Sequence, residues 1–296
     1  MTYARHELSN DQVSLPRMPS WVTSGRAETP EDVAFLSGAA LNHLHLVLNR
    51  EDLPQVLLRH RFALRAAETC VIHSGRPYRD VELRDAVAFL RPDDSPGPAG
   101  EVYLSWKRAV ARPLSVGGLH RALPDLEPEL IAMWLDAGQG PPVPRVASVL
   151  QAVMEDRPRE HTASLLLADA ALAQARGWSH VLPFLARGLK RAGLRKGGAD
   201  LRLICHRAIV SAAVEVTREA VDLARRIVRL KEVAPKLRAK GADEAVGLFL
   251  SRDAVAPTAL TSLRSDRAAR RFCDRLVELG AVRELTGRDT FRLYGI

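Results

Sequence analysis

The chain has 296 residues and a formal net charge of +8 at pH 7; 47% of its residues are hydrophobic and 26% are charged. This balance excludes a largely disordered chain, and the length allows two domains with buried cores. No apolar run reaches the about 18 residues of a membrane-spanning helix, and the N-terminus lacks the apolar segment of a signal peptide. We therefore expect a cytoplasmic protein with no membrane segment. Abundant Ala, Leu and Arg favour helices, because these residues lose little freedom on entering one.

The sequence predicts a flexible arm over residues 1–28 and a helical domain over residues 29–240. Thr29 followed by Pro30 is typical of a helix start, because Thr caps free amides and Pro suits the first turn. Loops rich in Pro and Gly interrupt the pattern at 91–98 and at 138–144, the latter a candidate hinge between subdomains. No fixed-period repeat is present, so we expect an irregular bundle. Before residue 195 we expect helices at 29–48, 53–74, 80–90, 99–111, 125–137, 146–154, 162–176 and 179–191.

The longest predicted helix covers residues 199–233, where apolar residues recur at alternating spacings of four and three. Such a stripe is typical of a core helix in a bundle, and it also fits the seam of a homodimer. We favour the core helix, and both interpretations remain open at this point. The stripe comprises Ile209, Ala213, Val216, Ala220, Leu223, Ile227 and Leu230, while Arg218, Arg225, Arg226 and Arg229 lie off it.

The positive charge is concentrated just before the C-terminal region. Residues 184–240 carry 15 Lys and Arg against 5 Asp and Glu, a net charge of +10, whereas residues 1–183 carry 19 against 22. A polyanion is a suitable partner for such a segment. The alternative is that these side chains only solvate the outer face of a long helix.

Residues 241–296 predict a winged helix, which is a common DNA-binding module. Short helices are expected at 243–250 and after Pro257, and a third at 265–279. Two alternating strands follow at 282–286 and 290–294, joined by a turn around Gly287. The expected fold class is therefore mainly α, an irregular helical bundle or array followed by a winged helix-turn-helix with a two-stranded wing.

The third helix of this module would be the recognition helix. Arg267, Arg270 and Arg271 are expected on its outer face, where a guanidinium can pair with guanine edges in the major groove. Arg288 at the wing tip suits a phosphate contact, and Arg226 on the long helix extends the basic face. In the alternative interpretation, the helix arginines pair with Asp266, Asp274 and Glu278 on the same helix. Residues 241–296 carry 9 Lys and Arg against 8 Asp and Glu, so a protein partner is also considered.

No residues in the chain form a recognisable catalytic or metal-binding motif. His43 and His45 are two positions apart on a helix, so their rings diverge. The CxxC, HExxH, GxxxxGK[ST] and GxSxG motifs are absent. The three cysteines are far apart on apolar helical faces, which indicates reduced, buried thiols. We therefore expect neither enzyme activity nor a cofactor nor a bound metal.

Three segments resemble an uncharacterised alphaproteobacterial family, the domain-of-unknown-function family 1403. They are residues 91–100 (RPDDSPGPAG), residues 233–242 (VAPKLRAKGA) and residues 265–296. The resemblance spans most of the chain and implies a bacterial protein, often carried on plasmids or other mobile replicons, with no assigned activity. Residues 279–288 (LGAVRELTGR) also look like the wing of many Fic-type proteins. The Fic catalytic motif HPFxxGNGR is absent, so the resemblance implies only the wing.

The sequence therefore favours a cytoplasmic protein of a plasmid or mobile element that binds double-stranded DNA through its C-terminal winged helix. The alternative is an interaction subunit of a DNA-maintenance complex, in which the winged helix binds a protein. Either form is compatible with a homodimer.

Overall fold

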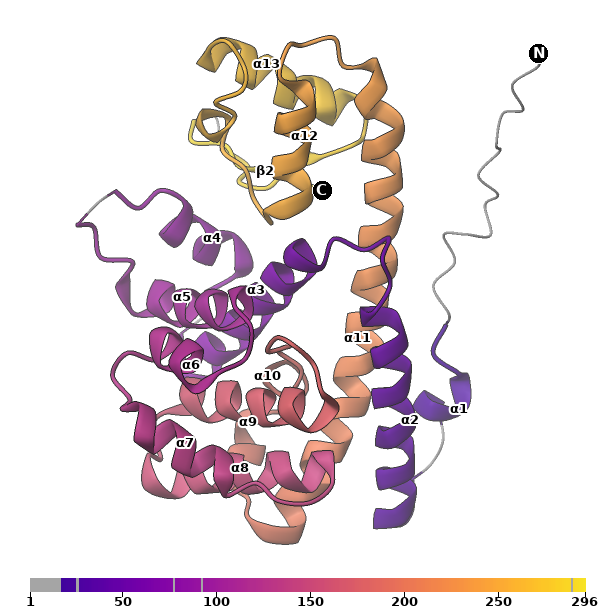
Figure 1. Ribbon diagram of the computed structural model, residues 1–296, viewed down its shortest axis with the longest axis vertical. Coiled ribbons are helices and arrows are strands. Elements are labelled where there is room, and N and C mark those ends of the chain that lie inside the picture. Colours follow the sequence, from indigo (N-terminus) through magenta and orange to yellow (C-terminus); the bar gives the residue numbers. More distant parts are fainter. Residues whose placement is uncertain (1–16, 25–26, 77, 92, 289) are drawn as a thin grey trace.

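The computed structural model describes residues 17–24, 27–76, 78–91, 93–288 and 290–296, and it is mainly α-helical. Figure 1 shows a helical body joined by the long helix α11 to a smaller C-terminal unit at one end. Within the described ranges, the paired strands form one two-stranded antiparallel sheet, which lies in the C-terminal unit. The predicted fold class, mainly α with a C-terminal two-stranded sheet, is confirmed.

The helical body contains the elements up to α11. They are α1 (Ser20–Ser24), α2 (Pro30–Leu48), α3 (Gln55–His73), α4 (Asp80–Ala88), α5 (Gly97–Ala111), α6 (Val116–Ala122), α7 (Pro128–Asp136), α8 (Pro142–Asp156), α9 (His161–Arg176), α10 (Leu185–Gly188), the 3-10 helix η2 (Arg191–Arg195), α11 (Gly198–Val233) and the 3-10 helix η3 (Ala234–Lys236). In the described part of the chain, none of these helices combines the length and the apolar character that a bilayer-spanning segment needs.

The start of the chain differs from the predicted arm. Residues 1–16 of that arm lie outside the described residues, but Ser20–Ser24 form helix α1, which contacts both α2 and α11. Val22 is buried and joins the core. Helix α6 was not predicted either, because its sequence VGGLHRA holds two glycines, which disfavour helices.

The prediction of a helix over residues 179–191 was wrong. Residues 180–184 are not helical; the short helix α10 follows them, and the 3-10 helix η2 begins at Arg191. The carboxylate of Asp169 on α9 accepts hydrogen bonds from the amides of Phe184 (3.1 Å) and Leu185 (2.9 Å). These amides are thus held by a distant side chain, which fixes the start of α10 at residue 185.

Helix α11 is a core helix of the body. All seven residues of its predicted stripe are buried within the chain, so the core-helix interpretation is confirmed. The helix packs against α2, α8 and α10. Its approach to α10 is close: a Cβ at Gly188 would lie 2.1 Å from the carbonyl oxygen of Ala208. Only glycine fits at that crossing.

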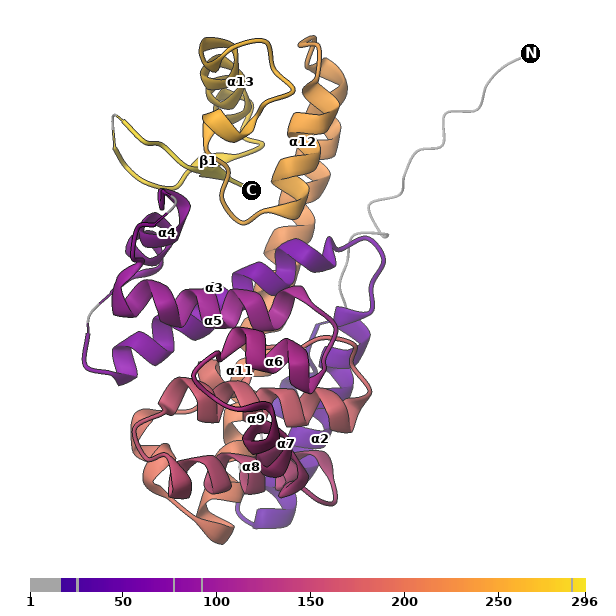
Figure 2. The same cartoon turned by 60° about the vertical axis from the view of Figure 1, so that its left-hand side comes forward.

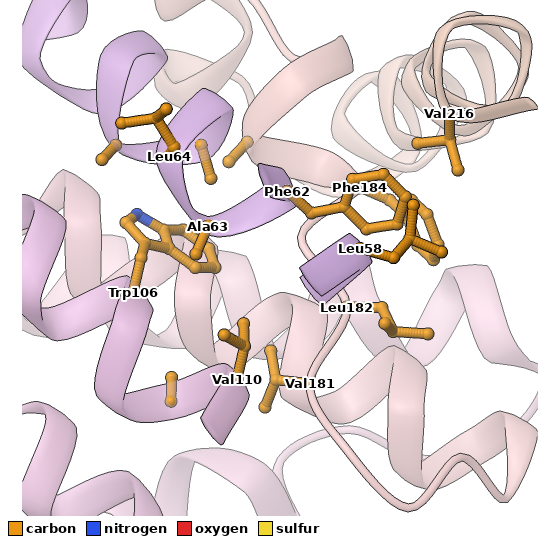
Figure 3. Packing of buried hydrophobic residues seen from close by; sticks show 14 of the residues in the cluster. Leu58, Phe62, Ala63, Leu64, Trp106, Val110, Val181, Leu182, Phe184 and Val216 are labelled. Atoms are coloured by element: carbon orange, nitrogen blue, oxygen red, sulfur yellow. The ribbon is translucent and has the colours of Figure 1, made fainter. Parts of the chain in front are cut away.

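Aromatic side chains from α3, from α5 and from the residue just before α10 pack in the centre of the body, as Figure 3 shows. The rings of Phe62 and Phe184 lie with centroids 6.3 Å apart, and the indole of Trp106 donates to the Cys70 sulfur at 3.4 Å. Cys70, Cys205 and Cys273 are buried and free, as predicted, and burial raises the pKa of each thiol to about 12. Thiolate chemistry is therefore suppressed at these positions.

The C-terminal unit has the predicted order of elements. It contains α12 (Ala242–Ser251), the 3-10 helix η4 (Pro257–Ala259), α13 (Asp266–Glu278), β1 (Arg283–Glu284) and β2 (Tyr294–Gly295). Helix α12 is slightly longer than predicted, whereas the second helix, α13 and both strands are shorter, and β2 begins at the last residue of the predicted strand. The second predicted helix is thus a single 3-10 turn. In the sheet, Arg283 pairs with Gly295 and Glu284 with Tyr294, and Val255 adds an isolated bridge to Tyr294.

The buried carboxyl of Asp169 gives a testable pH dependence. Burial raises its pKa to about 7 from an ordinary value of 3.8, although backbone hydrogen bonds lower it. The folded protein therefore keeps this proton where the unfolded chain releases it, so the stability that the group contributes is complete below pH 3.8 and is lost as the pH rises through about 7. We expect Asp169→Asn to remove this loss, because Asn cannot ionise. The measurement is the melting temperature of the parent and of the variant from pH 4 to pH 8. If both melting temperatures fell in parallel as the pH rose, the pH dependence would not come from Asp169.

Candidate nucleic-acid interface

Helix α13 has one buried face and one cationic face. The Ser265 side chain caps its start by accepting from the amide of Ala268 at 3.2 Å. The apolar side of the helix packs inward through Ala269, Phe272, Cys273 and Leu276. Because these four residues occupy one stripe, the arginines between them must point outward. Arg267, Arg270 and Arg271 are accordingly exposed, as predicted.

A basic groove lies between α13 and the segment that follows α11. We define it by its cationic residues Lys236, Arg238, Arg267, Arg271 and Arg275, which line a cavity of about 500 Å³. The three arginines are four positions apart, so they stand on one side of the helix. Among the described residues, no Asp or Glu lines this groove. It therefore concentrates positive charge in a unit whose net charge is close to zero.

The groove's cations are mostly without ionic partners. Arg275 pairs with Glu278 at 2.9 Å, which is the intrahelical pairing considered above. Within the described ranges, Arg267 and Arg271 have no ion-pair partner, and Arg270 on the neighbouring side of α13 has none either. An exposed, unpaired guanidinium keeps its full capacity for a bidentate anion contact.

Arg288 is placed elsewhere. Its guanidinium pairs with the carboxylate of Asp85 on α4, and Phe291 makes an edge contact with Phe89 at a centroid distance of 5.7 Å. Figure 2 shows the hairpin loop beside α4, at the end of the helical body. Arg288 and Phe291 thus contact the body, and Arg288 does not join Arg267, Arg270 and Arg271.

Arg226 is also separate from the basic groove. It lines a second cavity of about 350 Å³ together with Arg61 of α3 and Arg283 of β1. Burial and then the charge of Arg226 lower the pKa of Arg283, so the cations here repel one another. Nearby, Arg229 donates to the carbonyl of Leu279 at the end of α13 (3.0 Å). The basic C-terminal part of α11 therefore contacts the C-terminal unit.

A buried ion cluster joins the C-terminal unit to the body. The Asp253 carboxylate accepts a hydrogen bond from the Nε of Arg84 at 2.6 Å. It also forms an ion pair with Arg61, whose Nε lies 3.4 Å away. Arg84 also pairs with Asp80 at 2.9 Å, and Arg61 donates to the carbonyl oxygen of Ile296. Burial would raise the pKa of Asp253, but the charge and hydrogen bond of Arg84, followed by Arg61, lower it overall. Asp253 is therefore an anion that fixes the unit's position.

Sequence reasoning found three of the cations on α13 but missed Lys236, Arg238 and Arg275. The spacing of Arg267, Arg271 and Arg275 was a readable pattern, because residues four apart share a helix face. Nothing local places Lys236 and Arg238 beside them, since that depends on how α11 ends. In the described part of the chain, no group of three or more His, Cys, Asp or Glu residues is arranged to hold a metal.

Comparison with protein families places the chain in a family of unknown function. The family model DUF1403, a protein family of unknown function, covers residues 6–296. The chain belongs to this family. No curated protein shows significant similarity to it. Membership in DUF1403 agrees with the resemblance noted in the sequence, and it leaves the basic groove as the feature from which a function is argued.

Proposed function

We propose that the protein binds double-stranded DNA through the basic groove, with the C-terminal unit acting as a winged helix and α13 as its recognition helix. The observation that supports this most is the set of five cations without a lining carboxylate, three on the outer face of α13 and two on the segment after α11. Phosphate contacts of this kind supply most of the affinity of DNA-binding proteins. Arg270, on the neighbouring side of α13, is then available for base edges.

Two of the residues predicted to bind DNA need further conditions. Arg288 would have to leave Asp85 before it could contact a phosphate. Arg226 would contribute only if DNA also approached the second cavity. The cytoplasmic location, the alphaproteobacterial plasmid or mobile element and the Fic-like wing are proposed from sequence patterning and resemblance alone.

Protein binding is the second candidate function, favoured by the docked wing. A wing held by Arg288 and Asp85 is not free to enter a minor groove. The basic groove would then accept an acidic segment of a partner, as in a DNA-maintenance complex. Binding of a stoichiometric protein partner without any DNA affinity at low salt would favour this function over the first.

The proposal predicts a salt-dependent loss of DNA affinity in the double variant Arg267→Ala/Arg271→Ala. Losing two phosphate contacts should weaken binding about tenfold or more and reduce the salt slope by about two. Both side chains are exposed, so the fold should be unaffected. Fluorescence anisotropy with a labelled duplex at several salt concentrations measures this. Arg121→Ala is the matched control, since Arg121 is exposed on the helical body and outside the groove. Equal affinity of parent and double variant, or an equal loss in the control, would refute the groove.

A further inference from the structure

A third cavity with a basic lining lies within the helical body, outside the C-terminal unit. It has a volume of about 670 Å³ and is enclosed by the end of α3, the end of α8, the start of α9, η2 and the first turn of α11. This volume lies in the range of about 300–1,000 Å³ that is typical of small-molecule sites. None of its lining residues belongs to the basic groove. A ligand in this cavity would therefore bind independently of DNA at the basic groove.

One side of this cavity carries four exposed cations, Arg159, Arg191, Arg195 and Lys196. Within the described ranges, none of the four has an ion-pair partner. The one acidic side chain on the wall is Glu155, and it already accepts from the Nε2 of Gln151 at 2.7 Å. The rim thus has an excess of positive charge, with four cations against the single carboxylate of Glu155.

Two histidines, His73 and His161, lie on the inner wall of the cavity. His73 is 7% exposed, and its buried Nδ1 has no hydrogen-bond partner among the described residues. A buried polar nitrogen of this kind costs about 1–3 kcal/mol unless a ligand or water satisfies it. Burial, and then the charges of His161 and Arg191, lower the pKa of His73. Its ring is therefore neutral at pH 7 and can either donate or accept.

The remaining wall is apolar. Leu194 and Leu201 are buried, and Met154 is half-buried beside them. The cavity therefore combines an apolar floor, a polar nitrogen without a partner and a cationic rim. This combination matches a ligand with an organic part and a multiply charged anionic group. Guanidinium groups favour phosphate oxygens, which they bind in a bidentate geometry.

We propose that this cavity binds a small phosphate ester of nucleotide size. The phosphates lie at Arg191, Arg195 and Lys196, and the organic part lies on Leu194, Leu201 and Met154. His73 lies on the wall next to the organic part. A DNA duplex is too wide to enter a cavity of about 670 Å³, which favours a small ligand over a nucleic-acid backbone.

Isothermal titration calorimetry of the full chain with ADP and with inorganic pyrophosphate tests this site. We expect ADP to bind and pyrophosphate to bind at least tenfold more weakly, because only ADP reaches the apolar floor. Arg191→Ala/Arg195→Ala should weaken ADP binding at least tenfold. Arg202→Ala, an exposed arginine of α11 outside the cavity, should leave ADP affinity unchanged.

Three results would overturn the proposal. The first is the absence of binding by both probes, and the second is an equal loss of ADP affinity in the Arg202→Ala control. The third is a loss of DNA affinity in Arg191→Ala/Arg195→Ala together with no ADP binding by the parent protein, because the cavity would then be part of a DNA-binding surface. Equal affinity for ADP and pyrophosphate would refute the role of the apolar floor. Loss of DNA binding in the groove variant with ADP binding intact would support two separate sites.

Discussion

Asp253→Ala is expected to lower the free energy of unfolding by about 3–5 kcal/mol and to loosen the C-terminal unit. The Asp253 side chain is only 5% exposed and is the shared anion of Arg61 and Arg84. Removing it takes one anionic partner from two largely buried guanidinium groups, which leaves Arg84 with Asp80 and Arg61 with the backbone oxygen of Ile296. The loss should be largest at the boundary between body and unit, because Asp253 belongs to the unit and both arginines belong to the body.

Urea unfolding and limited proteolysis measure this effect. Cleavage should accelerate around residues 236–241, between α11 and α12, and leave a resistant helical body. Asp243→Ala is the matched control, because Asp243 is an exposed carboxylate of the same unit. Its loss should remove only the favourable charge at the start of α12, worth about 1 kcal/mol or less. If the two variants unfold alike, the buried cluster does not hold the interface.

The same cluster should weaken in acid. The folded pKa of Asp253 is lowered from its ordinary value of 3.8, so its stabilising contribution is present above that value. It is lost as the pH falls through the lowered folded pKa. The difference in unfolding free energy between the parent and Asp253→Asn should therefore narrow below pH 3.8. A difference that stays constant into acid would contradict this assignment.

Ile227→Asp is expected to disrupt the helical body, with a loss of about 3–5 kcal/mol or more. Ile227 is 2% exposed on α11, between Leu223 and Leu230 of the buried stripe. Ionisation of an unpaired carboxylate there is strongly unfavourable, so the residue must either stay protonated or open the helix packing. Circular dichroism melts should show a large fall in melting temperature.

Arg226→Glu is the neighbouring control. Arg226 lies off the buried stripe and lines a cavity that holds both cations, such as Arg61 and Arg283, and the carboxylates Glu215, Glu219 and Asp222. A glutamate there stays partly exposed and within reach of several guanidinium groups, so the fold should be retained. DNA affinity of this variant also decides whether Arg226 contributes to the nucleic-acid surface, as the sequence predicts. A collapse of Arg226→Glu together with a parent-like melt of Ile227→Asp would show that the assigned helix face is wrong.

Local patterns in the sequence were sufficient for most helices. Thr29 accepts from the amide of Asp32 as a predicted N-cap would, and the stripe from Ile209 to Leu230 gave the buried face of α11. These features depend on neighbours within one or two turns, so the sequence contains the whole pattern. The same holds for the outward arginines of α13.

The features that were missed depend on contacts between distant residues. Asp253 and Arg84 are 169 positions apart, and neither shows by its local context that it is one half of a buried pair. The helix expected at 179–191 does not form as predicted, because Asp169 on the neighbouring helix α9 accepts hydrogen bonds from backbone amides near residue 184. Arg288 was read as a free wing tip, whereas its position is decided by Asp85 on α4.

Helix α11 has 36 residues, Gly198–Val233, and contains neither Gly nor Pro after its first residue. At about 1.5 Å per residue it is a rod of roughly 54 Å, and helices of this kind bend gently unless such residues or an inserted group kink them. Leu201, at one end, forms the floor of the larger cavity, and Arg229, near the other, holds the last carbonyl of α13. A small tilt of this rod at the cavity would therefore become a larger sideways displacement of α13, because a stiff lever amplifies motion with distance from its pivot.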